Sequence, residues 1–62
     1  DKVEYVIQIN GKKRDLIEAA INIDENDLVQ TAKLNTNLKK YLHEKKIKKI
    51  IFIKNKLMNI II

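Results

Sequence analysis

The chain has 62 residues, a formal net charge of +5, a hydrophobic fraction of 45% and neither cysteine nor proline. This length allows one small domain of marginal stability, because a chain of about 60 residues buries only about 60% of the surface that it exposes when unfolded. The lack of cysteine excludes a disulfide framework and a cysteine zinc site, and no apolar run approaches the ~20 residues of a membrane span. Because the chain begins with Asp1 rather than Met, we expect a module excised from a longer protein.

Charge is distributed unevenly along the chain. Residues 1–31 carry four basic and seven acidic side chains, whereas residues 32–62 carry nine basic and one acidic. Isoleucine, lysine and asparagine supply 31 of the 62 residues, a bias typical of A/T-rich coding, so the abundance of lysine alone indicates no function. The near absence of acidic residues from residues 32–62 is more informative and favours an anionic partner, most often nucleic acid. A solvated lysine-rich face is an equally good interpretation of charge alone.

The first third of the chain predicts a β-hairpin. Residues 3–10 alternate apolar and polar side chains and are rich in β-branched residues, which indicates a half-buried strand. Asn10-Gly11 follows at once, a dipeptide that suits both positive-φ positions of a type I′ turn. Residues 12–19 should pair back as an edge strand, because they contain few large apolar side chains and begin with cations that discourage further pairing.

Two short helices are predicted next. Asp24 can cap the first helix, and the polar segment 35–37 should break it before the second begins. Lys39, Lys40 and His43 face outward on the second helix. The apolar residues expected to face inward are Leu28, Val29, Ala32, Leu34, Leu38, Tyr41 and Leu42.

A second hairpin completes the chain. Residues 47–53 are apolar on both faces, which is typical of a central strand or of a strand whose second face meets another surface. Residues 54–56 form a turn in which Asn55 tolerates the left-handed conformation, and residues 57–62 form the last strand. The fold class is α+β, with residues 1–62 as one ββααββ domain whose two hairpins form a four-stranded sheet with both helices on one face. The strand order is left open.

No catalytic centre is predicted. Gly11 is the only glycine, which excludes a glycine-rich phosphate loop. Asp24, Glu25 and Asp27 sit where a helix begins and are interpreted as capping residues rather than metal ligands. His43 is expected to face solvent. We therefore expect no catalytic residue, no metal and no cofactor in this chain.

Basic residues concentrate around both predicted turns, on the second helix and at the entrance of the third strand. If both turn tips lie at the same end of the sheet, these residues form one positive edge that could neutralise phosphates. Tyr5, Tyr41 and Phe52 occupy core-facing positions, so we expect recognition of a folded RNA by shape and backbone rather than base stacking on the sheet. The basic residues are Lys12, Lys13, Arg14, Lys39, Lys40, Lys45, Lys46, Lys48, Lys49, Lys54 and Lys56.

Several short motifs follow one another in a characteristic order and spacing. They comprise Val6, Gln8, Asn10-Gly11-Lys12 and Arg14, then Ile17-Glu18, Leu38-Lys39-Lys40-Tyr41-Leu42 and Ile47-Lys48-Lys49, and finally Lys56-Leu57 with Asn59. In this arrangement the whole chain resembles the C-terminal domain of bacterial-type leucyl-tRNA synthetase. Asp15, Glu44 and Asn55 stand where that family usually has glycine. A carboxylate at Asp15, beside Arg14, is expected to weaken phosphate attraction at the first hairpin.

The resemblance implies a tRNA-binding appendage that hangs on a linker and touches the outer corner of tRNA(Leu), where the D and TΨC loops meet. It further implies that the remainder of a cytoplasmic, monomeric ligase binds ATP with Mg²⁺ and leucine and charges the tRNA, with no DNA or membrane partner. Turn geometry is the favoured role for Asn10 and Gly11, and a solvated face is an equal alternative for Lys48 and Lys49. The residues carried over as candidate RNA contacts are Asn10, Gly11, Lys12, Arg14, Lys48, Lys49, Lys56 and Asn59.

An alternative from another class is a protein-interaction or dimerisation module. It would dock through the apolar residues 50–53 and the C-terminal isoleucines 60–62. Such a module should self-associate or bind its partner with weak dependence on salt, whereas RNA binding through lysines should weaken steeply as salt increases.

Overall fold

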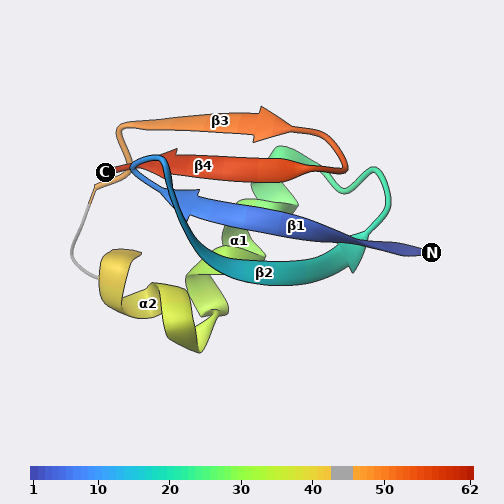
Figure 1. Cartoon of the computed structure of the whole chain (residues 1–62), viewed down its shortest axis with the longest axis horizontal. Helices are drawn as coiled ribbons and strands as arrows, with labels where there is room; N and C mark the ends of the chain where they lie inside the picture. The colour runs from blue at the N-terminus through green and yellow to red at the C-terminus, as the bar shows by residue number, and fades with distance from the viewer. Residues whose placement is uncertain (43–45) are drawn as a thin grey trace.

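The computed structural model of the chain describes residues 1–42 and 46–62. The predictions made above for His43, Glu44 and Lys45 therefore lie outside the described residues. The elements follow the predicted order ββααββ, and the fold class is confirmed as a small α+β domain with a four-stranded sheet and two short helices (Figure 1).

The first two strands form the predicted hairpin. β1 (Lys2–Ile9) and β2 (Lys12–Ala20) pair antiparallel. Asn10, with φ 53°, and Gly11, with φ 85°, both adopt the positive φ that a type I′ turn requires. The register of the pair shifts near the turn, between Ile7 and Gln8.

The two helices are separated by a single residue. α1 (Glu25–Leu34) is preceded by Asp24 at the predicted N-cap position, although its side chain makes no capping hydrogen bond. Asn35 ends α1, where its backbone N–H donates to the carbonyl of Ala32 over 3.1 Å. Its Oδ1 also accepts from the N–H of Asn37 over 2.8 Å, which satisfies a free donor at the start of α2 (Thr36–Leu42). One asparagine thus terminates one helix and begins the next.

The second hairpin joins the first in a mixed sheet. β3 (Lys49–Ile53) and β4 (Leu57–Ile61) pair antiparallel, and β4 pairs parallel with β1. The strand order is β2-β1-β4-β3. β2 is the edge strand that its sequence predicted. β3 is also an edge strand, so the first of the two interpretations of residues 47–53, a central strand, is wrong, whereas a strand whose second face meets another surface stays open.

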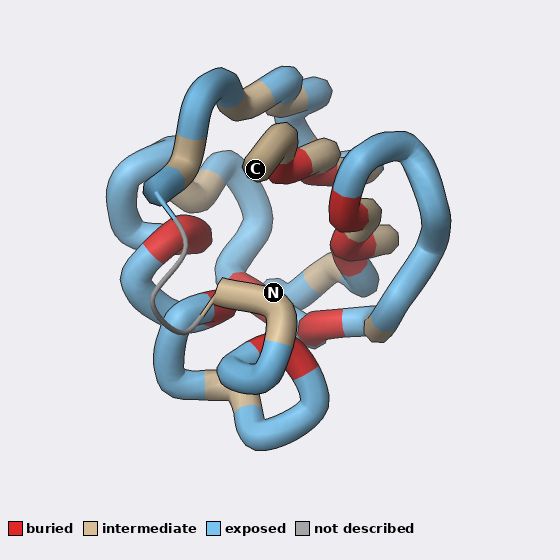
Figure 2. The backbone as a smooth tube through the Cα atoms, turned by 90° about the vertical axis from the view of Figure 1, so that its left-hand side faces the viewer, coloured by how far each residue is buried: buried red, intermediate tan, exposed pale blue. Residues whose placement is uncertain are grey.

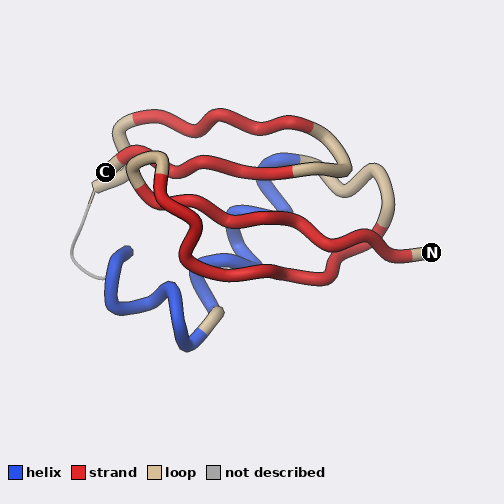
Figure 3. Tube along the Cα trace, in the orientation of Figure 1, coloured by secondary structure: helices blue, strands red, loops and turns tan. Residues whose placement is uncertain are grey.

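The hydrophobic core lies between one face of the sheet and the helices. In Figure 3 α1 runs behind the strands. Figure 2 shows buried positions on both the strands and the helices. Leu34, expected to face inward, is instead 76% exposed at the last position of α1. The core consists of Tyr5, Ile7, Ile9, Ile17, Ala19, Leu28, Val29, Ala32, Leu38, Met58 and Ile60.

The opposite face of the sheet explains why β3 is apolar on both sides. The pairs Val6–Leu16, Val6–Leu57 and Ile53–Leu57 place one apolar row across all four strands. Ile51 and Ile53 are 42% and 45% exposed on this face, which no helix covers within the described residues. Ile53 therefore continues the apolar row to the edge of the sheet, whereas Ile51 pairs with the polar Asn59. Apolarity on this face does not mark a strand in the centre of the sheet.

Two asparagines fasten the loop after β2 to the turn between β3 and β4. Asn22 and Asn55 both have φ 63°, as predicted for Asn55. The N–H of Asn22 donates to Oδ1 of Asn55 over 2.8 Å, and Nδ2 of Asn55 donates to Oδ1 of Asn22 over 3.1 Å. The N–H of Asn55 also donates to the hydroxyl of Tyr5 over 2.7 Å, which connects the turn to the buried β1.

We expect Asn55→Ala to lower the free energy of unfolding by about 3 kcal/mol, of which the two side-chain hydrogen bonds with Asn22 supply the larger part. A left-handed conformation costs alanine roughly 1 kcal/mol or more, and the lost hydrogen bonds contribute about 1 kcal/mol each. Asn55→Gly tolerates the conformation and should lose only the hydrogen bonds. Urea unfolding of the 62-residue chain measures both variants. Equal losses for alanine and glycine would show that the backbone conformation contributes nothing.

Candidate nucleic-acid interface

The parallel pairing of β1 with β4 decides where the two basic turns lie. The turn at residues 10–11 follows β1, whereas the turn at residues 54–56 precedes β4. Because the two strands run in the same direction, the end of one and the start of the other lie at opposite ends of the sheet (Figure 1). The condition for one positive edge, that both turn tips lie at the same end of the sheet, is therefore not met.

Seven of the eight candidate residues nevertheless gather at the end that carries the first turn. Asn10 Oδ1 accepts from the N–H of Ile62 over 2.9 Å, which joins the turn to the end of β4. The N–H of Lys48 donates to the carbonyl of Ile61 over 2.8 Å, so the entrance of β3 lies at the same end. The exception is Lys56, which lies beyond the opposite end of β4. The gathered residues are Asn10, Gly11, Lys12, Arg14, Lys48, Lys49 and Asn59.

Three of these candidates hold the turn itself. The N–H of Gly11 donates to Oδ1 of Asn59 over 2.9 Å, and Asn10 uses its own Oδ1 on Ile62. A Cβ added at Gly11 would meet nothing within 4 Å, so the need for glycine comes from the φ of 85° and not from crowding. The favoured interpretation of Asn10 and Gly11 as turn residues agrees with these contacts, and Asn59 shares the role.

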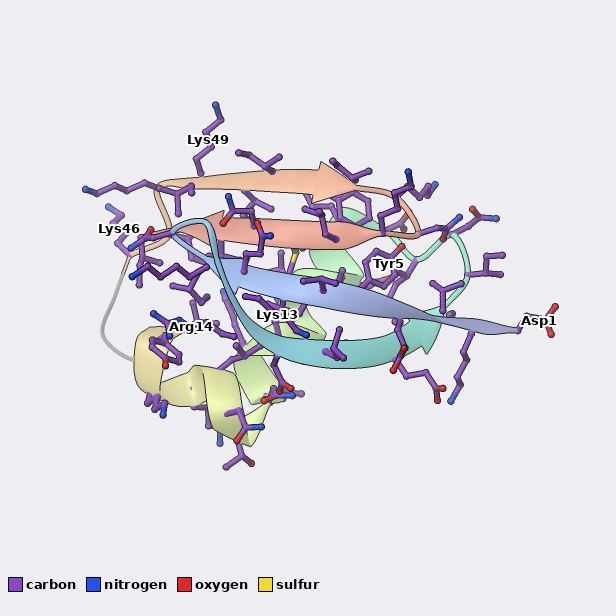
Figure 4. All side chains as sticks on the ribbon, in the orientation of Figure 1. Asp1, Tyr5, Lys13, Arg14, Lys46 and Lys49 are labelled. Carbon is purple, nitrogen blue, oxygen red and sulfur yellow. The ribbon has the colours of Figure 1, made fainter. Side chains whose placement is uncertain are left out.

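Exposed cations surround this turn and form what we call the basic end. Figure 4 shows Arg14, Lys46 and Lys49 at the side of the molecule where the first turn lies. All members are exposed, and α2 contributes two of them beside the start of β2. The basic end comprises Lys12, Lys13, Arg14, Lys39, Lys40, Lys46, Lys48 and Lys49.

Carboxylates predominate toward the other end. Asp1 lies there in Figure 4, and the cross-strand pair Glu4–Glu18 follows it along β1 and β2. The start of α1 adds Asp24, Glu25 and Asp27, against the cations Lys2, Lys54 and Lys56. Folding thus converts a charge asymmetry along the sequence into an asymmetry between the two ends of the molecule.

The carboxylate of Asp15 accepts hydrogen bonds through both of its oxygens. Its Oδ1 accepts from the N–H of Leu16 over 2.8 Å, and its Oδ2 accepts from Nδ2 of Asn37 over 3.3 Å. These hydrogen bonds, the one from Leu16 foremost, hold the pKa of Asp15 below its ordinary value. Asp15 therefore serves as a negatively charged tie between β2 and α2.

Tyr41 is a residue that sequence reasoning missed at this site. It was expected only to face the core, and its ring does pack against the core with partial burial. The Cζ of Arg14 nevertheless lies over that ring, 4.9 Å from its centroid, and the Nζ of Lys40 lies 5.2 Å away. The spacing of Lys40 and Tyr41 was visible in the sequence, but the approach of Arg14 from β2 was not.

Other kinds of site receive no support from the described residues. Within 1–42 and 46–62, no group of three or more His, Cys, Asp or Glu side chains is placed to hold a metal ion, and no helix is long and apolar enough to cross a membrane. The docking surface proposed as an alternative, residues 50–53 and 60–62, is smaller than expected, because Ile60 is fully buried and Ile50 packs against the core. Only Ile51 and Ile53 remain exposed from the apolar segment of β3.

Comparison with solved structures finds this fold in a synthetase. The chain superposes with a TM-score of 0.88 and 22% identity on the crystal structure of the ternary complex of Agrobacterium radiobacter K84 agnB2 LeuRS-tRNA-LeuAMS. The match covers 97% of this chain and 8% of the synthetase chain. At this identity the likeness shows the fold alone.

Sequence relatives identify the segment. The chain is 45% identical over 62 residues to a leucine–tRNA ligase of Prochlorococcus marinus strain MIT 9515. It is 44% identical over 62 residues to that of Clostridium tetani and 50% identical over 62 residues to that of Borrelia garinii subsp. bavariensis. Each match covers all of this chain but only 7% or 8% of the relative. No family model matches the chain.

The chain is therefore homologous to a segment of an aminoacyl-tRNA synthetase. That enzyme is the bacterial leucyl-tRNA synthetase, or leucine–tRNA ligase, of whose length the chain spans less than a tenth. The resemblance inferred from the motifs is thus confirmed.

We expect the stability of the chain to depend on the ionisation of Asp15. Because its folded-state pKa is lowered, its stabilising contribution is complete above its unfolded pKa of about 3.9 and is lost as pH falls through the folded value. Asp15→Asn should therefore flatten the decline in stability below about pH 4, as measured by urea unfolding across a pH series. An unchanged pH profile would contradict the tie between β2 and α2.

We also expect Asn59→Ala to lower the free energy of unfolding by about 1 kcal/mol, because the Gly11 N–H loses its acceptor. Hydrogen exchange at Gly11 should accelerate in the same variant. Asn59→Asp keeps an acceptor oxygen and serves as the matched control. Unchanged stability and exchange in Asn59→Ala would contradict a structural role and favour the predicted RNA contact.

Proposed function

We propose that this chain is the tRNA-contacting appendage of a leucine–tRNA ligase and that its basic end meets the outer corner of tRNA(Leu), where the D and TΨC loops meet. In this proposal a linker joins the chain to the rest of a cytoplasmic, monomeric enzyme, which binds ATP with Mg²⁺ and leucine and performs the leucylation. The chain itself contributes RNA positioning and no catalytic step.

The observation that carries the proposal is the concentration of exposed cations at the end of the molecule that carries the first turn, where Figure 4 shows Arg14, Lys46 and Lys49. Cations on neighbouring strands and on α2 can face several phosphates of a folded RNA at once. Each neutralised phosphate releases counterions, and this release favours binding at low salt. The carboxylate of Asp15 accepts a hydrogen bond from the side chain of Asn37 in α2, so part of its role is to hold β2 against that helix.

The acidic opposite end supports one orientation of approach. A molecule with cations at one end and mostly carboxylates at the other is turned by the field of a polyanion so that the basic end leads. Lysine side chains are flexible point charges, which suits contact with a backbone of irregular shape. Recognition of the tRNA corner by shape requires no further base-reading group.

A protein-docking function is the second candidate, and the exposed Ile51 and Ile53 on the uncovered face favour it. Ile53 extends the apolar row of Val6 and Leu57 to the open edge of the sheet, and Ile51 lies two residues before it on the same face of β3. Docking there would be nearly independent of salt, whereas tRNA binding at the basic end would not be. The two candidates therefore differ in one measurable property.

We expect Lys12→Ala and Lys48→Ala, each made in the full-length ligase, to weaken binding of tRNA(Leu). Each should also reduce the slope of log K against log salt by about one, provided that the lysine neutralises one phosphate. Lys56→Ala is the matched control, because it removes the same charge beside a turn at the opposite end. Fluorescence anisotropy with labelled tRNA between low and physiological salt provides the measurement.

The variants that lose tRNA affinity distinguish tRNA binding at the basic end from the other possibilities. A loss of affinity in Lys56→Ala alone would contradict contact through the basic end and assign the contact to the second turn. Unchanged slopes in all three variants would contradict tRNA contact by this segment. In that case self-association or partner binding that is lost in Ile53→Glu would favour the docking function.

A further inference from the structure

A β-bulge sets Arg14 apart from the other cations of the basic end. Ile7 pairs with Asp15, but the next residue of β1, Gln8, pairs with Lys13. Arg14 is therefore the extra residue of β2 and has no partner in β1. Such a bulge changes the direction of the strand and re-aims its side chain, and here Arg14 lies over the ring of Tyr41.

The platform beneath Arg14 is held in place from three directions. Leu38, one turn before Tyr41, is fully buried and anchors α2 in the core. Asn35 caps the helix through the N–H of Asn37, and the side chain of Asn37 donates to Asp15, the residue next to Arg14. The same contacts thus fix both the start of α2 and the bulged segment of β2.

We propose that Tyr41 is a positioning residue for RNA binding, which holds the guanidinium of Arg14 against its ring so that Arg14 makes a directed, bidentate contact with a phosphate. This inference rests on the proposed tRNA-binding function. A guanidinium that uses its face on an aromatic ring keeps its N–H edge for the paired oxygens of a phosphate. The contact also restricts the rotamers of Arg14 before binding, so less side-chain entropy is lost when the phosphate binds.

The composition of the chain makes this contact distinct from the others. Arg14 is the only arginine among 13 basic residues, and the remaining members of the basic end are lysines. An ammonium group is a point charge with no planar fork. Arg14 should therefore orient the RNA, while the lysines supply attraction that depends mainly on charge.

The test compares conservative substitutions in the full-length ligase by measuring the dissociation constant for tRNA(Leu). Arg14→Lys keeps the charge but loses the planar fork, so affinity should fall about two- to tenfold, as for the loss of one hydrogen bond, with the salt slope unchanged. Tyr41→Leu removes the ring and should cause a similar loss. Tyr41→Phe keeps the ring without the hydroxyl and should bind as the unmodified ligase does.

A double substitution establishes that Tyr41 acts through Arg14. Arg14→Ala should weaken binding and lower the salt slope by about one, and adding Tyr41→Leu should then cause no further loss. Hydrogen exchange of the α2 amides verifies that the helix remains folded in Tyr41→Leu. If α2 unfolds in Tyr41→Leu, the affinities of Arg14→Lys and Tyr41→Phe are compared instead, because neither substitution removes the part of Tyr41 that packs in the core.

Failure of this inference is distinguishable from failure of the proposed function. If Arg14→Ala weakens binding but Tyr41→Leu does not, with α2 intact, the positioning role of Tyr41 is overturned. If Arg14→Lys binds as well as the unmodified ligase, or Tyr41→Phe as poorly as Tyr41→Leu, the directed contact is overturned as well. The Lys12→Ala and Lys48→Ala variants report independently on tRNA contact by the basic end.

Discussion

The parallel ladder between β1 and β4 is the constraint on which the rest of the molecule depends. It joins the two hairpins into one sheet and places two fully buried residues, Ile7 and Met58, side by side on the inner face. It also brings the end of β4 to the first turn, where Ile62 donates to Asn10. The same ladder separates the two lysine-bearing turns, since parallel strands cannot place the end of one beside the start of the other. Core packing and charge distribution thus follow from a single pairing.

Asparagine performs the work at the ends of this ladder that glycine performs in many turns. Asn10, Asn22 and Asn55 all adopt positive φ, and each uses its side-chain oxygen on a partner that is distant in sequence or in another loop. Glycine would accept the conformation but make no such bond. In a chain too short to bury a large core, residues that both turn the backbone and fasten it to a neighbour add stability where hydrophobic burial is limited.

Local patterns in the sequence predicted the elements, and distant pairings explain what they missed. The alternation in β1, the Asn10-Gly11 turn, the buried face of α1 and the left-handed Asn55 all depend on neighbours in sequence, and the structure confirms them. The edge position of β3 was missed because apolarity on both faces does not distinguish a central strand from an edge strand that extends an uncovered apolar row. The candidate site was predicted only in part, because its composition is local but its arrangement depends on distant pairings. The cations were evident from the sequence, whereas their division between two ends depends on the β1–β4 pairing, and the contact of Arg14 with Tyr41 depends on a bulge.

The concentration of cations has a thermodynamic consequence for the folded state. Eight positive side chains around one turn repel one another, and such repulsion disfavours the compact state, in which they are closest. Counterions or RNA phosphates at the basic end relieve that repulsion, and a ligand that binds only the folded chain stabilises it in proportion to the logarithm of its concentration. The cation–π contact of Arg14 with Tyr41 and the hydrogen bond from Asn37 to Asp15 oppose the repulsion, because both hold β2 against α2. In the proposed function, these internal contacts offset part of the repulsion among the cations, and bound tRNA would offset the rest. Binding and folding stability would then be coupled at the same residues.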